Sequence, residues 1–322
     1  MIWLSFLLLI LGLALLGGAS GVAISNLVTI SEKRRLRKSI LSFLLVAFST
    51  SLPELLVAVN AITLGNMAVS LGDLLGSNIT NIALIIGLCL IVASLGNSHR
   101  KVIFKEEDKR EFKTGLMFLS ITLLTLLYLQ YADNIVGLLL LALFFAYSYV
   151  LLRKRREEGD DRPDEFKDRG IRKELAFTIA GIIGVIVGAR LTLESSIDIA
   201  TFFGVPASII GATLIALGTS LPELFVDIKA AHTGFLEIAM GDIVGSCFMN
   251  STLVLGLLIL FTPFRVNILV LSDLILFSVV SNIVLWYFLD RGDMGRRGGF
   301  ILLTIYLVNL LSLLGILILR SP

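Results

Sequence analysis

Long apolar stretches alternate with short polar ones along the whole chain. Each apolar stretch is roughly 18–28 residues, enough for a helix to cross a bilayer core. The stretches lack the two-residue alternation of a membrane β-barrel strand. Division at charge clusters and at Gly, Pro and Asn breaks predicts ten helices, at 3–28, 39–63, 67–94, 113–130, 134–152, 174–202, 207–231, 236–261, 267–289 and 299–319. The predicted fold class is all-α, a polytopic membrane protein with ten transmembrane helices.

Composition supports this class and excludes others. The 322 residues are 56% hydrophobic and only 16% charged, with a mean hydropathy of +0.93, which is far more apolar than a soluble domain. A net charge of +2 gives no reason to expect a nucleic-acid partner. The two cysteines, Cys89 and Cys247, lie inside apolar stretches, where a disulfide framework has no role.

Basic residues predict the orientation in the membrane. The loops after predicted helices one, three, five and nine hold 23 of the 27 Lys and Arg residues, and all four lie on one side if the helices alternate. That side is predicted to be cytoplasmic in an inner or plasma membrane, with the amino terminus outside. No basic residue precedes Lys33, so we interpret the first apolar run as a helix rather than a cleaved signal peptide.

The chain contains an internal repeat. Thr-Ser-Leu-Pro-Glu occurs at 50–54 and again at 219–223, and Gly-Asp-x-x-Gly-Ser-x-x-x-Asn occurs at 72–81 and 241–250, all with one offset of 169 residues. Five predicted helices belong to each half, so the second half enters the membrane in the opposite sense. We therefore predict two inverted repeats, at 1–152 and 174–322, joined by a mixed-charge cytoplasmic hinge loop at 153–173. Inverted repeats are typical of alternating-access transporters.

The first repeated motif places a carboxylate inside the membrane. Proline at 53 and 222 cannot donate a backbone hydrogen bond, which predicts freed carbonyls at Ser49 and Gly218. Glu54 lies four residues after Thr50 and three after Ser51, a spacing that puts these side chains on one helix side. Glu223 has the same relation to Thr219 and Ser220. A mid-membrane acidic residue costs roughly 2.5–3.5 kcal/mol, so two such carboxylates indicate a shared cation.

The second motif predicts the opposite wall of the same site. Ser77 with Asn81, and Ser246 with Asn250, have the four-residue spacing that shares a helix face. Hydroxyl, amide, carbonyl and carboxylate oxygens are ligands for hard cations such as Ca²⁺ and Na⁺. Small residues at helix interfaces can also serve packing and hydrogen bonding alone. Their position opposite a repeated Pro-Glu motif favours the ligand interpretation.

Together, the two blocks resemble the α-repeats of the calcium/cation antiporter superfamily, particularly the prokaryotic sodium/calcium exchangers. The resemblance extends over both repeats. It implies a diamond-shaped cluster of ion sites at the bilayer centre, with Glu54 and Glu223 as shared Ca²⁺ ligands. It also implies Na⁺ coordination by hydroxyls and carbonyls around a set of residues completed by two asparagines: Thr50, Ser51, Ser77, Thr219, Ser220, Ser246, Asn81 and Asn250.

This sequence departs from the family pattern in three places. Ser49 stands where the second repeat has Gly218. The last motif position is asparagine in both repeats, whereas some exchangers have an aspartate in one of them. Asp73 and Asp242 each add a carboxylate one turn before the motif serine, where an asparagine is expected. These two aspartates put the driving ion and the stoichiometry in question.

The sequence predicts transport rather than enzymatic catalysis, with Ca²⁺ and Na⁺ as the transported ions and no cofactor. The predicted activity is Ca²⁺ export in exchange for Na⁺. An H⁺/Ca²⁺ exchanger is the alternative within the superfamily, with Asp73, Asp242 or the glutamates taking protons. A passive cation channel also uses acidic residues, but the inverted repeat argues against it. An intramembrane hydrolase is disfavoured because no nucleophile–base pair is recognisable.

Two further polar pairs have simpler interpretations. Arg190 and Glu194 have the i, i+4 spacing of a mutually neutralising ion pair. Asp227 and Lys229 are expected either to pair at a cytoplasmic vestibule or to extend to the membrane boundary.

Overall fold

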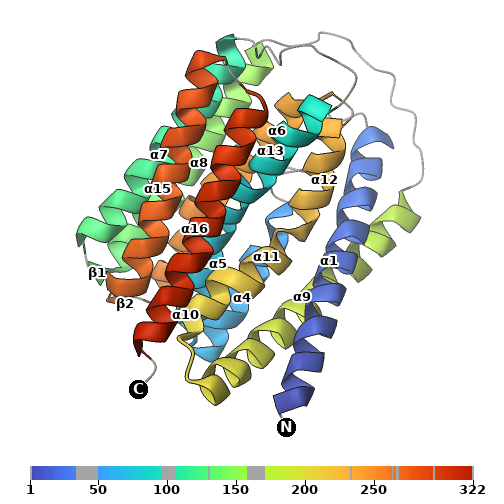
Figure 1. Cartoon of the computed structure of the whole chain (residues 1–322). Helices are drawn as coiled ribbons and strands as arrows, with labels where there is room; N and C mark the ends of the chain where they lie inside the picture. The colour runs from blue at the N-terminus through green and yellow to red at the C-terminus, as the bar shows by residue number, and fades with distance from the viewer. Residues whose placement is uncertain are drawn as a thin grey trace.

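The computed structural model describes residues 2–33, 50–95, 104, 106–129, 131–157, 171–232, 234–262, 264–265, 268–292 and 294–320. These residues form a bundle of helices (Figure 1). In chain order the elements are α1 (Ile2–Lys33), α4 (Leu52–Leu64), α5 (Met67–Ile79), η2 (Thr80–Ile85), α6 (Ile86–Leu95), α7 (Glu106–Leu129), β1 (Tyr131–Ala132), α8 (Asn134–Glu157), α9 (Arg172–Phe203), α10 (Ala207–Ile210), η3 (Gly211–Ile215), α11 (Ala216–Thr219), α12 (Leu221–His232), α13 (Leu236–Met249), η4 (Asn250–Val254), α14 (Leu255–Phe261), β2 (Phe264–Arg265), α15 (Ile268–Arg291) and α16 (Arg296–Arg320).

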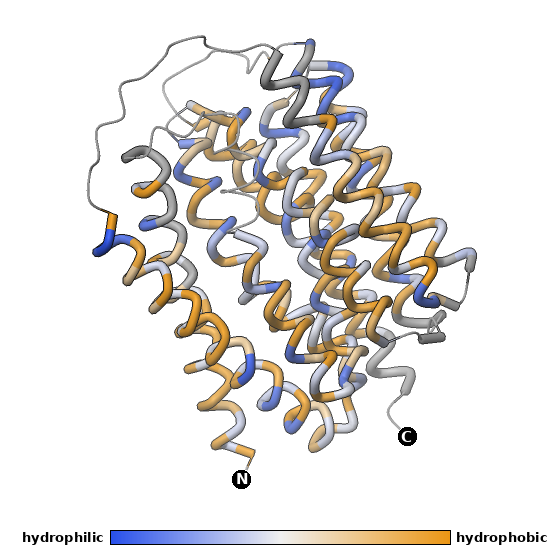
Figure 2. The backbone as a smooth tube through the Cα atoms, turned by 180° about the vertical axis from the view of Figure 1, so that it is seen from behind, coloured by the Kyte–Doolittle hydropathy of each residue, from blue (hydrophilic) through white to orange (hydrophobic). Residues whose placement is uncertain are grey.

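The all-α prediction is confirmed at the level of class. The two strands are two-residue segments that pair antiparallel, Tyr131 with Arg265 and Ala132 with Phe264, and link two connections at one end of the bundle. Six described helices are long and apolar enough to cross a membrane, or seven if the bent pair Ala207–Thr219 and Leu221–His232 is one span. α4 and the apolar part of α8 are shorter. Figure 2 shows hydrophobic residues along most of the helix length.

Most predicted helix boundaries agree with the structure to within about five residues, with α7 as the main exception. α7 begins at Glu106 rather than at 113. Its charged first turns are stabilised as helix by an ion pair between Lys109 Nζ and Glu106 Oε1 at 2.6 Å. A second ion pair, of 2.8 Å, joins Lys113 to Asp290 at the end of α15. The charges that suggested a loop therefore extend the helix into the polar region. The first part of the predicted helix at 39–63, with Ser49, lies outside the described residues.

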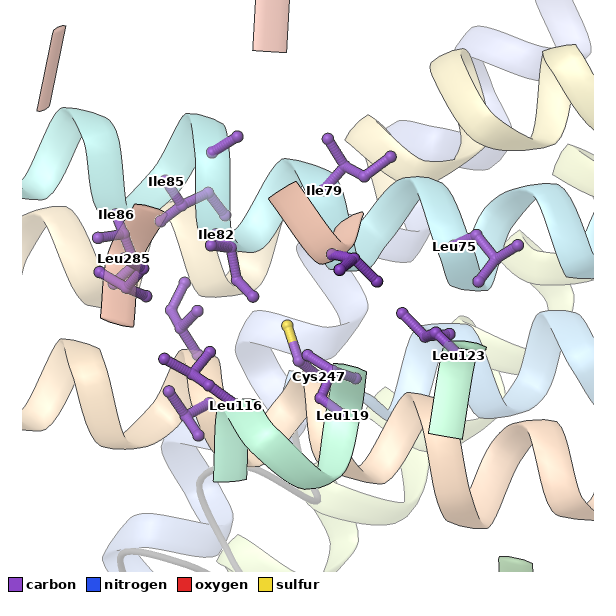
Figure 3. Close-up of a cluster of buried hydrophobic side chains, with 14 of the residues drawn as sticks. Leu75, Ile79, Ile82, Ile85, Ile86, Leu116, Leu119, Leu123, Cys247 and Leu285 are labelled. Carbon is purple, nitrogen blue, oxygen red and sulfur yellow. The ribbon is translucent and has the colours of Figure 1, made fainter. Parts of the chain in front are cut away.

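Two long helices, α5–η2–α6 and α13–η4–α14, run through the centre of the bundle and pack against other helices along their length. We call these two helices the central rods. Figure 3 shows part of the apolar core, where Leu75, Ile79 and Ile82 of the first rod lie near Leu119 of α7 and Cys247 of α13. These side chains are fully or nearly fully buried. α1 and α9 pack along each other at one side of the bundle (Figure 1) and share a second core cluster with α4.

Each central rod contains a π-helical turn that the sequence pattern did not predict. η2 begins at Thr80 and η4 at Asn250, so the two turns occupy nearly the same place in the two repeats. A third π-turn, η3, precedes the second Pro-Glu motif. A π-turn widens the helix locally and is frequent at functional sites. Of the three turns, η2 begins beside Asn81 of the second motif and η4 begins at the related Asn250.

Candidate ion-binding site

The second copy of the first repeated motif forms a bend between α11 and α12, and the motif serines of the two copies share one backbone conformation. Ser51 has φ −82° and ψ 8°, and Ser220 has φ −82° and ψ 7°, so the related serines adopt the same non-helical conformation. Across this bend, of 48°, the Ser220 N–H still donates to the Ala216 carbonyl at 3.1 Å. The Leu224 N–H donates to the Ser220 carbonyl at 3.0 Å. The bend is therefore local, and the proline stands in a first helical turn, where its missing N–H costs little.

Both glutamates lie in the protein interior. Glu54 is in the first turn of α4 and Glu223 in the first turn of α12. Both side chains are fully buried, and none of their four carboxylate oxygens has a hydrogen-bond partner within the described part of the chain. The positive end of a helix dipole favours a carboxylate at this place. It does not replace the solvation that a buried charge loses.

Two symmetric hydrogen-bonded sets connect the repeats. Thr50 Oγ1 donates to Asp242 Oδ1 at 3.3 Å and lies 3.1 Å from Ser246 Oγ. In the related set, Thr219 Oγ1 donates to Asp73 Oδ1 at 3.0 Å and lies 3.2 Å from Ser77 Oγ. Each threonine comes from one repeat and its partners from the other. The predicted opposing walls are therefore in direct contact.

The four carboxylates of these motifs lie close to one another. The Glu54 carboxylate faces Thr219 and Ser77, and it is near enough to Asp73 and Glu223 for like-charge repulsion. Glu223 is similarly near Asp242. Asp73 and Asp242 each have one oxygen, Oδ2, without a hydrogen-bond partner among the described residues. Unpartnered carboxylates that repel one another in an apolar interior require cations or protons to be stable.

The remaining predicted residues are buried with unused polar groups. The Ser51 and Ser220 hydroxyls and both amide atoms of Asn81 and Asn250 have no hydrogen-bond partner in the described ranges. All twelve predicted site residues are at most 4% exposed. Within those ranges, no three His, Cys, Asp or Glu side chains are grouped closely enough to hold a metal ion by themselves. Any ion site here needs hydroxyl, amide or backbone carbonyl oxygens as well.

The structure corrects one expectation and confirms another. Asp227 does not extend to the membrane boundary. It is fully buried, and neither carboxylate oxygen has a hydrogen-bond partner in the described part of the chain. The sequence signal for this position was its spacing of four residues from Glu223, which places both on one face of α12. The Arg190–Glu194 pair is confirmed, with Nε and Oε1 2.9 Å apart.

Sequence reasoning also missed a polar contact between the central rods. Asn78 Nδ2 donates to Ser251 Oγ at 2.8 Å, and Cys247 Sγ lies 3.9 Å from the Asn78 carbonyl oxygen. Asn78 and Cys247 are related by the same offset of 169 residues as the motifs. These related positions therefore touch each other where the two halves meet.

This chain is similar to known proteins over most of its length. The chain matches the family "Sodium/calcium exchanger protein" over residues 4–153 and 173–315. It is 28% identical to the sodium/calcium exchanger MaX1 of Methanosarcina acetivorans, over 97% of this chain and 99% of that protein. It is 31% identical to the inner membrane protein YrbG of Escherichia coli, over 82% of each chain.

A solved structure is also similar to this chain over nearly its whole length. The sodium–calcium exchanger NCX_Mj, soaked with 10 mM Na⁺ and zero Ca²⁺, superposes with a TM-score of 0.66 at 26% identity, over 97% of this chain and 99% of that one. The same exchanger soaked with 2.5 mM Na⁺ and 0.1 mM Ca²⁺ also superposes with a TM-score of 0.66. Family match, sequence and fold agree over nearly the whole chain. This chain is a multi-pass membrane protein that belongs to the sodium/calcium exchanger family.

Proposed function

We propose that this protein is a secondary active antiporter that exports Ca²⁺ in exchange for Na⁺ at a single mid-membrane site. The observation that carries the proposal is the symmetric pairing of Thr50 with Asp242 and of Thr219 with Asp73. These pairs surround two glutamates whose carboxylates have no hydrogen-bond partner among the described residues. Each repeat supplies half of the oxygen ligands. Movement of one half relative to the other then opens the same site to either side of the membrane.

Coupling follows from shared ligands. Glu54 and Glu223 together balance one Ca²⁺, and hydroxyl and carbonyl oxygens of the motifs offer positions for Na⁺. The two ions compete because they use the same carboxylates. The unloaded site carries buried negative charge, which is costly to move through an apolar barrier. Crossing therefore requires a bound counter-ion, and this requirement prevents a leak.

The proposed architecture completes this mechanism. Ten transmembrane helices form two inverted five-helix repeats, 1–152 and 174–322, connected by a cytoplasmic hinge at 153–173. The protein lies in the inner or plasma membrane with its amino terminus outside. The odd number of helices in each repeat is what places the two Pro-Glu motifs in opposite orientations within one bilayer.

Flux measurements with separate gradients test the proposal. We expect the purified chain in proteoliposomes to accumulate ⁴⁵Ca²⁺ against its gradient when an outward Na⁺ gradient is imposed. A proton gradient of equal size, with Na⁺ absent, should drive little uptake. Ca²⁺ flux that only dissipates the Ca²⁺ gradient and ignores Na⁺ would contradict antiport and indicate a channel.

H⁺/Ca²⁺ exchange is the second candidate, and the buried aspartates favour it. Asp73 and Asp242 add two carboxylates to the two glutamates, so one Ca²⁺ leaves negative charge uncompensated. Bound protons would remove that charge without additional ligands. Na⁺ remains the first proposal because the Thr and Ser hydroxyls of both repeats provide more oxygen ligands than one Ca²⁺ and two glutamates need.

The double variant Asp73→Asn, Asp242→Asn separates the two candidates. Asparagine keeps an oxygen that can accept the threonine hydrogen bonds, so the two sets around Thr219 and Thr50 should persist. We expect Na⁺-driven Ca²⁺ flux to remain, with a changed Ca²⁺ affinity and a weaker dependence on pH. If only a proton gradient drives Ca²⁺ flux in the native protein, and the double variant loses this flux, the protein is an H⁺/Ca²⁺ exchanger and not a Na⁺/Ca²⁺ exchanger.

The orientation has its own test. A cysteine introduced at Asp160, in the proposed cytoplasmic hinge and outside the described residues, should resist an impermeant thiol reagent in intact cells. Labelling should appear once the membrane is opened. The unmodified chain is a suitable background because Cys89 and Cys247 are both buried. Immediate labelling of intact cells would reverse the proposed orientation.

A further inference from the structure

Asp227 breaks the symmetry of the site. The carboxylates of the two motifs occur as repeat-related pairs, Glu54 with Glu223 and Asp73 with Asp242. The position related to Asp227 by the same offset is Ala58, which is 1% exposed and packed in the apolar core. The first repeat therefore forms this part of the fold with a methyl group. A structural requirement of the scaffold does not explain the carboxylate in the second repeat.

The described surroundings of Asp227 destabilise the negative charge of its carboxylate. Its side chain is fully buried, and both oxygens lack a hydrogen-bond partner in the ranges that the structure describes. It lies on the same face of α12 as Glu223 and close enough to Asp242, from the packed helix α13, for like-charge repulsion. Such a group is strongly destabilising unless a cation binds it or a proton neutralises it.

The position of Asp227 along α12 places its carboxylate to one side of the central glutamates. α12 runs from the bend at Ser220 toward His232, so Asp227 lies roughly 6 Å beyond Glu223 along the helix axis. Figure 1 shows α12 leading to the end of the bundle at which α1 terminates. α1 ends there at Lys33, and we propose this end to be cytoplasmic. Asp227 therefore lies between the central carboxylates and the side from which exported Ca²⁺ enters.

We propose that Asp227 and Asp242 form an additional binding site for a hard divalent cation, in which hydroxyl, backbone carbonyl or water oxygens complete the coordination. The inference rests on the proposed function and extends it. Carboxylate oxygens are among the ligands that Ca²⁺ prefers, and two carboxylates balance its charge. Ca²⁺ arriving from the cytoplasm binds first at this off-centre site and then moves one helical turn to the central glutamates. Only the second repeat has the site, so the two sides load Ca²⁺ differently.

Equilibrium Ca²⁺ binding to the purified full-length chain in Na⁺-free detergent tests the proposal. Glu54→Gln removes a central ligand that the off-centre site does not use, so we expect it to retain a weaker Ca²⁺ site. Adding Asp227→Asn should weaken that remaining binding at least tenfold, because the variant loses a charged ligand. Asp198→Asn, a charge-removing change on α9, is the matched control and should leave Ca²⁺ binding unchanged.

Asp227→Ala provides a second variant, because it places at this position the residue that the first repeat already accommodates. Thermal unfolding should show that both Asp227 variants are folded. Equal Ca²⁺ binding by Glu54→Gln with and without the Asp227 change would overturn the off-centre site. So would an Asp227→Asn protein in which only the pH dependence of transport changes, which would assign a proton to Asp227. Absence of Ca²⁺ binding to the unmodified chain would instead refute the proposed function itself.

Discussion

Glu54→Gln and Glu223→Gln should each abolish Ca²⁺ transport in proteoliposomes while leaving a folded protein. Both side chains are fully buried, and no described residue donates a hydrogen bond to their oxygens. Glutamine has nearly the same shape, so packing around the bends should be preserved. Its neutral amide cannot balance Ca²⁺. Loss of one buried charge partner costs roughly 3–5 kcal/mol, equivalent to roughly two to four orders of magnitude in affinity.

Glu237→Gln is the matched control for this result. Glu237 lies in the first turn of α13, like its two counterparts in their helices, but it is exposed. The control should transport Ca²⁺ normally, and all three variants should elute as one species with similar melting temperatures. Transport near the native level by either Glu54→Gln or Glu223→Gln would refute these residues as Ca²⁺ ligands.

Gly72→Ala and Gly211→Ala should each prevent correct assembly of the site. A Cβ at Gly72 would collide with the Ser208 carbonyl, and a Cβ at Gly211 would collide with the Val69 carbonyl. Both collisions are with backbone atoms, which cannot move aside as a flexible side chain can. Overpacking costs typically roughly 1–3 kcal/mol and occasionally more, and we expect the upper end here. The measurement is thermal unfolding together with the yield of monodisperse protein.

Transport should decline with stability in these variants, because the contact also sets the position of the second motif. Asp73 follows Gly72 directly, and its own backbone nitrogen lies 2.9 Å from the Cβ position at Gly211. Separation of α5 from η3 would therefore pull Asp73 away from Thr219. Gly18→Ala is the control, since nothing lies within 4 Å of a Cβ there. Native stability of Gly72→Ala would show that the two segments can separate without cost.

The sequence alone determined most of the helical framework. Hydrophobic runs end at charges and at breaking residues, and these local features predicted the ends of α5–α6 and α13–α14 within a residue. The offset of 169 residues by itself relates Thr50 to Thr219 and Asp73 to Asp242. A polar residue repeated inside apolar runs is costly everywhere except in a shared interior. That cost is why all twelve predicted residues could be expected to be buried.

Only the tertiary structure decided which residues meet. The sequence placed Thr50 beside Glu54 on one helix, but its partners Asp242 and Ser246 lie nearly 200 positions away, and no local period encodes such a contact. The π-turns at Thr80 and Asn250 were likewise not predicted, because the sequence pattern does not distinguish a π-turn from the α-helix around it. Asp227 is the clearest case. Its neighbour Lys229 suggested a membrane boundary, whereas the packing of α12 against α13 buries its carboxylate beside Asp242. Charge and hydropathy act locally along the chain, but burial depends on what the other helices cover.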